Sequence, residues 1–503
     1  MGLNADLVRR LGLLIGPLLA LATWLWTGTG ADPLAPAGRT TAAVAVLMAF
    51  WWLTQAVPLA ATALLPVLLF PLLGAGTVAE ATAPYSRPLI FLFLGGFLLG
   101  LAIQRSGLHR RIALQVLVRA GTRPSRLVAG FMLVTAGLSM WISNTATVIT
   151  LLPIAVSVLE ALGGRLRPAP DTLGGEEATP LSPALLLGVA YAASIGGMAT
   201  LIGTPPNLIL AAFLNDRYGT DLSMQAWLPI GLPLVALLLP VAWFYLTRIA
   251  FPLGRLKAQA GEDLLRGELR ALGPMGWHEW IVLLVFVLTA LGWVLRPQIA
   301  SWSGLPIDDA VIAMAGALVL FVIPVRKGRF AMDWEGAQGL PWGILILFGG
   351  GLSLAAAIER NGLDAFLAST LMGLQGIGLV WALLAVTGLV VFLTEITSNT
   401  AVTATLLPVL AATATALGHP TTPILVAAAL SASCAFMLPV ATPPNAVVFA
   451  SGKVSAGQMA VAGLGLNLIA ILLITTLVYL HPGLPQLQGS GEAVPVGTPL
   501  SSG

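Results

Sequence analysis

The sequence predicts an all-α polytopic membrane protein with about eleven transmembrane helices and two re-entrant helical hairpins, built as two inverted repeats of five spans after a first extra helix. Three observations support this fold class. The first is composition, because 57% of the 503 residues are hydrophobic and only 9% are charged, against about 25% charged in soluble domains. The others are apolar runs of membrane-spanning length and short polar motifs that occur twice.

A helix needs about 20 apolar residues to cross the hydrocarbon layer. Runs of this kind lie near residues 11–27, 39–56, 57–73, 88–105, 184–213, 226–250, 277–295, 306–325, 341–358, 421–450 and 456–480. Two further apolar segments remain, near 127–160 and 377–416. Each of them carries the polar triplet Ser-Asn-Thr, at Ser143 and at Ser398.

The first apolar run follows Arg9 and Arg10 and lacks a small-residue cleavage site, which indicates a retained first helix rather than a signal peptide. The single cysteine, Cys434, excludes an intramolecular disulfide. The net charge is +3, and the basic residues lie in loops between spans. This is the charge pattern of a protein in the cell membrane, with the lipid bilayer as its partner, and not of a nucleic-acid-binding protein.

The positions of Lys and Arg also predict orientation. With the N-terminus in the cytoplasm and both Ser-Asn-Thr segments returning to the side they enter from, the C-terminus lies outside. All 24 basic residues are then cytoplasmic except Arg39, Arg87, Arg217, Arg296 and Arg360. A full crossing of the first segment would place the Arg105 to Arg126 group opposite Arg165 and Arg167 and weaken this asymmetry, so re-entrant hairpins are favoured.

Internal repetition predicts two related halves. AIQRSGL at Ala102 recurs as AIERNGL at Ala357, 255 residues later, and the Ser-Asn-Thr triplet recurs at the same offset. The motif TPPN at Thr204 recurs at Thr442, an offset of 238, because the polar loop 165–182 lengthens the first half. Since each unit has an odd number of spans, the second unit must be inverted in the membrane.

The predicted organisation is therefore a first transmembrane helix within 1–38, a first repeat over 39–270, a second repeat over 271–480, and a disordered tail over 481–503. The first repeat contains the hairpin 127–160 and the broken helix 184–213. The second repeat contains the hairpin 377–416 and the broken helix 421–450.

The repeated motifs predict where helices restart. Ser, Asn and Thr are good N-cap residues, and proline suits the first helical position. Each Ser-Asn-Thr triplet is therefore expected to cap the returning half of its hairpin, and each Thr-Pro-Pro to cap a helix that breaks and resumes. Such irregular backbone cannot face lipid, so it must line a cavity inside the protein.

The same segments lack fixed positive charge. Residues 127–164, 183–215 and 365–452 contain no Lys or Arg, and their only acids are Glu160 and Glu395. Helix N-termini attract anions, and the carbonyls that precede them suit hard cations. An anion bound here would need its charge balanced by mobile cations, which predicts anion/cation cotransport.

The paired SNT triplets, together with GTPPN and the run SASCAFMLPVATPPNAVVF at Ser431 to Phe449, resemble the divalent anion/sodium symporter family. The resemblance covers the chain up to about His481. It implies a sodium-coupled importer of a di- or tricarboxylate such as succinate, malate or fumarate, with sodium as coupling ion and no other cofactor. It also implies a homodimer that works by an elevator-like alternating-access mechanism. Gln55 departs from the family, which often has an acid there.

Carried onto matching positions, the resemblance implies two sodium sites and one substrate site. Sodium site 1 would comprise Ser139, Ser143, Asn144 and Gly203, and sodium site 2 would comprise Thr394, Thr397, Asn399 and Ala441. The carboxylate substrate would contact Asn144, Thr145, Thr204, Pro205, Asn399, Thr400, Thr442 and Pro443. The repeat offsets agree, since they pair Ser139 with Thr394 and Thr204 with Thr442.

Other functions are compatible with parts of the pattern. A proton-coupled anion carrier could use Glu395 as a relay, although its repeat partner is Met140 and a structural role at the hairpin tip is equally consistent. A sodium-independent dicarboxylate exchanger would be expected to keep a basic residue in place of sodium. An intramembrane hydrolase with Ser143 or Ser398 as nucleophile would need a base, and the first hairpin and both TPPN segments contain no histidine.

Overall fold

The computed structural model describes residues 5–29, 33–121, 123–163, 180–253, 261–326, 329–371, 376–481 and 483–484. These residues are mostly helical, which confirms the predicted class. Their strands form one small antiparallel pair, β1 (Pro324–Arg326) with β2 (Arg329–Phe330). The predicted tail after residue 484 and the loop 164–179 lie outside the described residues.

The first part of the chain forms α1 (Ala5–Trp26), α2 (Pro36–Thr54), α3 (Leu59–Thr62), α4 (Leu65–Leu72), α5 (Val78–Thr82), the 3-10 turn η1 (Ala83–Ser86), α6 (Pro88–Ser106) and α7 (Leu108–Ala120). The next part forms α8 (Pro124–Ser139), α9 (Asn144–Gly163), α10 (Leu181–Gly197), α11 (Pro205–Tyr218), α12 (Met224–Phe244) and the π-helical turn η2 (Tyr245–Ala250).

The second half forms α13 (Gly261–Ala271), α14 (Trp277–Val294), α15 (Arg296–Ser303), α16 (Asp309–Val322), α17 (Trp334–Ala337), α18 (Trp342–Arg360) and α19 (Leu363–Leu371). It continues with α20 (Leu379–Thr394), α21 (Asn399–Ala416), α22 (Thr421–Ser431), α23 (Pro443–Ala450) and α24 (Ala456–Leu480).

Seven helices of the described chain are long and apolar enough to cross a membrane, by length and composition. They are Val78–Ser106, Asn144–Leu162, Met224–Ala250, Trp277–Val294, Trp342–Arg360, Asn399–Ala416 and Ala456–Leu480. Shorter apolar helices include α10 and α22, which end where the predicted spans 184–213 and 421–450 were expected to break.

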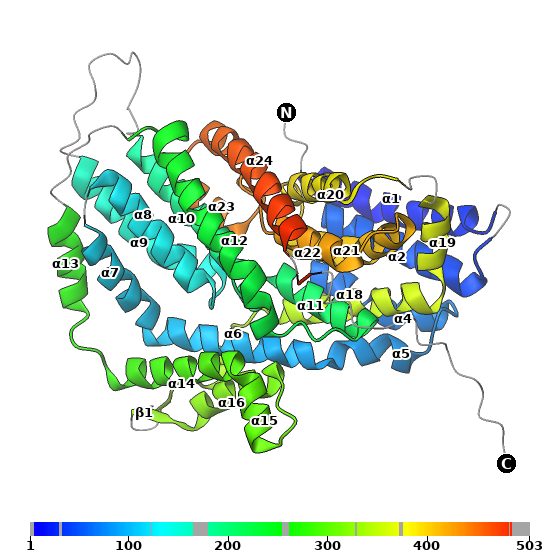
Figure 1. Ribbon diagram of the computed structural model, residues 1–503, viewed down its shortest axis with the longest axis horizontal. Helices are drawn as coiled ribbons and strands as arrows, with labels where there is room; N and C mark the ends of the chain where they lie inside the picture. Colours follow the sequence, from blue (N-terminus) through cyan, green and yellow to red (C-terminus); the bar gives the residue numbers. More distant parts are fainter. Residues whose placement is uncertain are drawn as a thin grey trace.

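Two bundles hold the polar motifs. In one, α8 and α9 lie against each other and against α10; in the other, α20, α21 and α22 pack together with α24 (Figure 1). The resumed helices cross between them, because α11 contacts α21 and α23 contacts α9. Helices α6, α14 and α16 form a separate layer along one side (Figure 1).

Helices α10 and α22 are the most enclosed parts of these bundles. Every residue from Pro183 to Gly197 in α10 is buried, and so is every residue of α22. Close packing requires glycine at Gly196, where an added Cβ would lie 2.3 Å from the carbonyl oxygen of Ala136 in α8. The hairpin α8–α9 is therefore held backbone-to-backbone against the helix that leads to the break.

Ion pairs gather at the two opposite ends of α6. The end at Arg87 carries Arg87–Asp216, Arg217–Glu359, Arg217–Asp364, Arg296–Asp221 and Arg360–Glu80. The end at Arg105, where α7 follows α6, carries Arg105–Asp333, Arg110–Glu268 and Arg111–Glu279. Four of the five basic residues assigned to the outside from sequence thus form ion pairs at the Arg87 end.

One pair at the Arg105 end is held ionised by its hydrogen bonds. Arg105 donates from both terminal nitrogens to the two carboxylate oxygens of Asp333, at 2.7 and 3.0 Å. This hydrogen bonding lowers the pKa of Asp333 to about 2. The pair therefore keeps both charges across the physiological pH range and joins the end of α6 to the start of α17.

Candidate functional site

Each Ser-Asn-Thr triplet starts a helix, and its asparagine meets a hydroxyl from the helix before it. Ser139 Oγ donates to Asn144 Oδ1 at 2.5 Å. In the second repeat, Thr394 Oγ1 donates to Asn399 Oδ1 at 2.6 Å. Both hydroxyl-bearing residues are fully buried. The structure thus brings together the repeat-related pairs that the resemblance placed in sodium sites 1 and 2.

The break between α10 and α11 adds a backbone carbonyl oxygen to predicted sodium site 1. A Cβ on Gly197 would lie 2.9 Å from Asn144 Oδ1 and 3.0 Å from the carbonyl oxygen of Gly203. Asn144 and Gly203 therefore converge on Gly197, which has no side chain to fill the space. Ser143 behaves differently, since its exposed hydroxyl accepts from Ala146 N at 3.3 Å and caps α9.

The predicted second site is less complete. Thr394 Oγ1 also donates to the carbonyl of Ala432 at 3.0 Å, which ties the hairpin tip to the second break. Thr397 Oγ1 donates to Leu393 O at 2.9 Å, and Thr397 lines a cavity of about 280 Å³ against α2. Among the described residues, no hydrogen bond joins Thr397 or Ala441 to Asn399.

The asparagine of each TPPN motif closes the connection between the two half-helices. Asn207 Nδ2 donates to the carbonyls of Gly197 and Thr200, at 3.3 and 2.8 Å. The repeat-related bonds of Asn445 Nδ2 are 3.1 Å each and go to Ala435 O and Leu438 O. Sequence reasoning singled out the motif but missed this role, although the shared fourth position was a usable signal.

Of the four helix starts at the SNT and TPPN motifs, two are capped by a side chain as the sequence predicted. Ser143 caps α9, and Thr442 Oγ1 accepts from Asn445 N at 3.3 Å to cap α23. The prediction is wrong for Ser398, which makes no side-chain cap, and for Thr204. The Thr204 hydroxyl instead lies 3.5 Å from Ser433 Oγ, so it links the break of the first repeat to that of the second.

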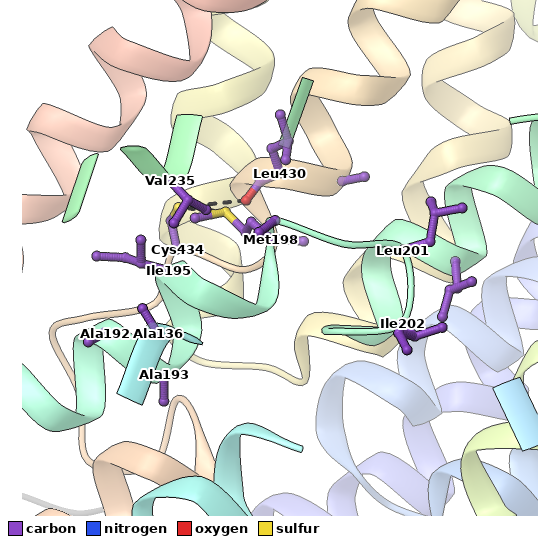
Figure 2. Close-up of a cluster of buried hydrophobic side chains, with 14 of the residues drawn as sticks. Ala136, Ala192, Ala193, Ile195, Met198, Leu201, Ile202, Val235, Leu430 and Cys434 are labelled. Atoms are coloured by element: carbon purple, nitrogen blue, oxygen red, sulfur yellow. Dashed lines mark hydrogen bonds between the residues drawn. The ribbon is translucent and has the colours of Figure 1, made fainter. Parts of the chain in front are cut away.

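The predicted substrate residues differ in exposure. Thr204 and Thr442 are buried, at 3% and 4% exposed, whereas Asn144, Thr145, Pro205, Asn399 and Thr400 are half-buried and Pro443 is exposed. A ligand could therefore reach the amides, the outer hydroxyls and the proline ends of these helix starts. The two connections also touch through Met198 and Cys434, whose sulfur atoms lie 3.9 Å apart (Figure 2).

Glu395 is the acid at the tip of the second hairpin and is only 3% exposed. Its Oε1 accepts from Phe436 N, Met437 N and Asn467 Nδ2 at 2.7, 2.9 and 2.8 Å, and its Oε2 accepts from Leu438 N at 3.0 Å. The sequence left open whether this acid relays protons or organises structure. Its hydrogen bonds hold the connection between α22 and α23, which favours the structural role.

The histidines nearest in sequence to the triplets are engaged elsewhere. His109 contacts Ile103 O and Thr150 Oγ1, each at 3.1 Å, and His419 contacts Ile377 O at 2.7 Å. Within the residues that the structure describes, no group of three His, Cys, Asp or Glu side chains is placed to hold a metal ion. The site is thus built from hydroxyls, amides, carbonyls and helix ends.

Similar proteins match most of this chain. The sodium-dependent dicarboxylate transporter SdcS of Staphylococcus saprophyticus is 41% identical over 478 residues, covering 93% of this chain and 90% of its own. SdcS of Staphylococcus aureus strain MW2 is 39% identical over 475 residues, with the same coverage. The crystal structure of the Alcanivorax borkumensis YdaH transporter shares the fold, with a TM-score of 0.58, 17% identity, and coverage of 94% of this chain and 97% of that one.

The family profile described as the sodium:sulfate symporter transmembrane region matches residues 16–482, which contain both hairpins and both broken helices. The resemblance seen in the SNT and TPPN motifs is confirmed by this match, and the hydrolase interpretation is excluded because the family and these relatives are transporters. The chain belongs to the sodium:sulfate symporter family.

Proposed function

We propose that this protein imports a C4-dicarboxylate, such as succinate, malate or fumarate, together with sodium ions. The observation that carries the proposal is the pair of hydroxyl–amide contacts, Ser139 with Asn144 and Thr394 with Asn399. Each contact collects oxygen atoms beside a helix start, in segments that contain no Lys or Arg. The relatives named as sodium-dependent dicarboxylate transporters support the same substrate and coupling ion.

The chemistry of the two amides suits two ligands at once. An asparagine amide oxygen can accept a hydrogen bond or coordinate a cation, while the amide nitrogen can donate a hydrogen bond to a carboxylate. Asn144 and Asn399 each turn their oxygen toward a buried hydroxyl. The amide nitrogens are then available to the dianion, and sodium ions bound on the oxygen side balance its charge.

We further propose the inverted-repeat architecture. Helices α8 and α20 start and end 255 residues apart, α9 and α21 start at the two asparagines, and α11 and α23 start at Pro205 and Pro443. The proposed organisation keeps eleven spans, two re-entrant hairpins, a cytoplasmic N-terminus and an outer C-terminus in the cell membrane. A homodimer in which the hairpin bundles move as an elevator completes this proposal.

Sodium is expected to tighten dicarboxylate binding, and the dicarboxylate to tighten sodium binding by the same factor, because linkage is reciprocal. Isothermal titration of succinate into the purified transporter in sodium and then in potassium at equal ionic strength measures the effect. Binding at least about tenfold tighter in sodium is expected. Equal affinity in both salts, in protein that transports succinate, would remove the sodium hypothesis and favour exchange or proton coupling.

The hairpin topology predicts opposite labelling of two introduced cysteines. Glu160 and Thr415 are exposed residues on the returning helices α9 and α21. In a Cys434→Ser background, Glu160→Cys is expected to react with an impermeant thiol reagent only from the cytoplasmic side, and Thr415→Cys only from outside. Labelling of both positions from one side would show that at least one segment crosses completely.

A further inference from the structure

Glu395 holds the hairpin tip against the second helix break through its four hydrogen bonds, an arrangement that we call the Glu395 clamp. The first repeat has a counterpart of different chemistry. The offsets that relate the repeats pair Glu395 with Met140 and Leu438 with Thr200. In the first repeat, Thr200 Oγ1 donates to the carbonyl of Met140 at 2.5 Å. Both repeats therefore tie the hairpin tip to the same point of the helix break, but only the second does so with a buried charge.

The Glu395 carboxylate holds the stretch of backbone that leads to Ala441 in predicted sodium site 2. Leu438 donates its N–H to Glu395 Oε2, and its carbonyl accepts from Asn445 Nδ2 and from Ala441 N, at 3.1 and 3.2 Å. Ala441 is the member of site 2 that the resemblance placed on this connection. A displacement of Leu438 would therefore displace Ala441 as well.

The hairpin side of site 2 starts at the residue next to Glu395. Thr394 donates to Asn399 and to Ala432, so the clamp and the amide contact share one short stretch of chain. In the sequence on either side of Glu395, residues 365–452 contain no Lys or Arg, and none of the ion pairs found among the described residues includes Glu395. Four hydrogen bonds stabilise this buried charge, and a cation at the adjacent site would stabilise it further.

We propose that Glu395 is a positioning residue for cation binding: with Asn467, it fixes the 432–442 connection so that sodium site 2, and not site 1, depends on its carboxylate. The two repeat-related sites are therefore unequal, and site 2 is the one favoured by a fixed negative charge. This inference rests on the proposed sodium coupling and adds a residue to it.

Glu395→Gln tests the clamp with little change in volume. The amide keeps one acceptor oxygen: in the Oε1 position it would lose the bond from Leu438 N, in the Oε2 position it would lose the other three, and in either case its NH₂ group would face N–H donors. We expect the sodium concentration for half-maximal succinate binding to rise about tenfold. The Hill coefficient for sodium is expected to fall, because one of the coupled sites no longer contributes.

Two further variants separate positioning from general loss of stability. Asn467→Ala removes one of the four donors and is expected to cause a smaller rise in the sodium requirement. Thr475→Val is the matched control, since Thr475 lies two turns further along α24 and its buried hydroxyl contacts Thr387 Oγ1 at 3.0 Å. Thr475→Val is expected to lower thermal stability without changing the sodium dependence of succinate binding.

Double-mutant cycles assign the effect to one site. Glu395→Gln is expected to be less than additive with Thr394→Ala and additive with Ser139→Ala. A folded Glu395→Gln protein with the parent's sodium half-saturation and Hill coefficient overturns the inference; if that variant does not fold, the same result for Asn467→Ala overturns it. A parent protein without sodium dependence would instead refute the proposed function.

Discussion

Asn144→Ala and Asn399→Ala are each expected to weaken sodium and dicarboxylate binding together, by about tenfold or more. Loss of a buried hydrogen-bonding partner costs about 1–3 kcal/mol, and about 1.4 kcal/mol corresponds to a factor of ten in affinity. Each alanine removes the oxygen that accepts from Ser139 or Thr394 and the nitrogen proposed to bind the carboxylate. A single substitution therefore removes one contact to each ligand.

The two asparagines offer a check that ordinary site variants lack. Because the repeat offset relates them, the two alanine variants should produce losses of the same kind in separate titrations of sodium and succinate. Thr145→Ser keeps the hydroxyl at the neighbouring position and is expected to change affinity only slightly. If both alanine proteins fold and bind both ligands as the parent does, the SNT triplets are packing devices and the site lies elsewhere.

Asn207→Leu and Asn445→Leu are expected to lower the melting temperature by about 2–6 °C. Leucine has a similar size but cannot donate, so the carbonyls that each amide now satisfies would be left without that partner in a buried connection. Each such loss costs about 1–3 kcal/mol. Thermal unfolding in detergent, followed by tryptophan fluorescence, measures the shift.

Asn215→Ala is the matched control for the first of these variants, because Asn215 lies on α11 with Asn207 but is exposed. It is expected to melt within about 1 °C of the parent, as surface substitutions cost little. Equal melting of Asn207→Leu and Asn215→Ala would show that the amide does not hold the break.

Local signals in the sequence were enough to predict where the functional helices start. Helices α9 and α21 begin at the asparagines of the two triplets, and α11 and α23 begin at Pro205 and Pro443. These boundaries depend on proline and on short polar side chains, whose effects extend over one helical turn. The repeat offsets then transferred each boundary from one half of the chain to the other.

Contacts between distant segments could not be predicted in this way. The bonds from Glu395 to residues 436–438 and Asn467 span 41 to 72 positions and follow no periodic pattern. Thr204 contacts Ser433 instead of capping α11, and this contact likewise depends on how the two repeats pack against each other. The sequence therefore indicated the helix starts but not the lengths of the connections 198–204 and 432–442 or what holds them.

Uptake of labelled succinate into sealed proteoliposomes tests sodium-coupled dicarboxylate transport most directly. Gradients of sodium, potassium or protons are imposed one at a time across the same vesicles. The account predicts concentrative uptake with an inward sodium gradient, none with potassium or protons alone, and loss of sodium-driven uptake in Asn144→Ala and Asn399→Ala. Equal uptake without sodium, driven by a proton gradient or by succinate trapped inside, would contradict it.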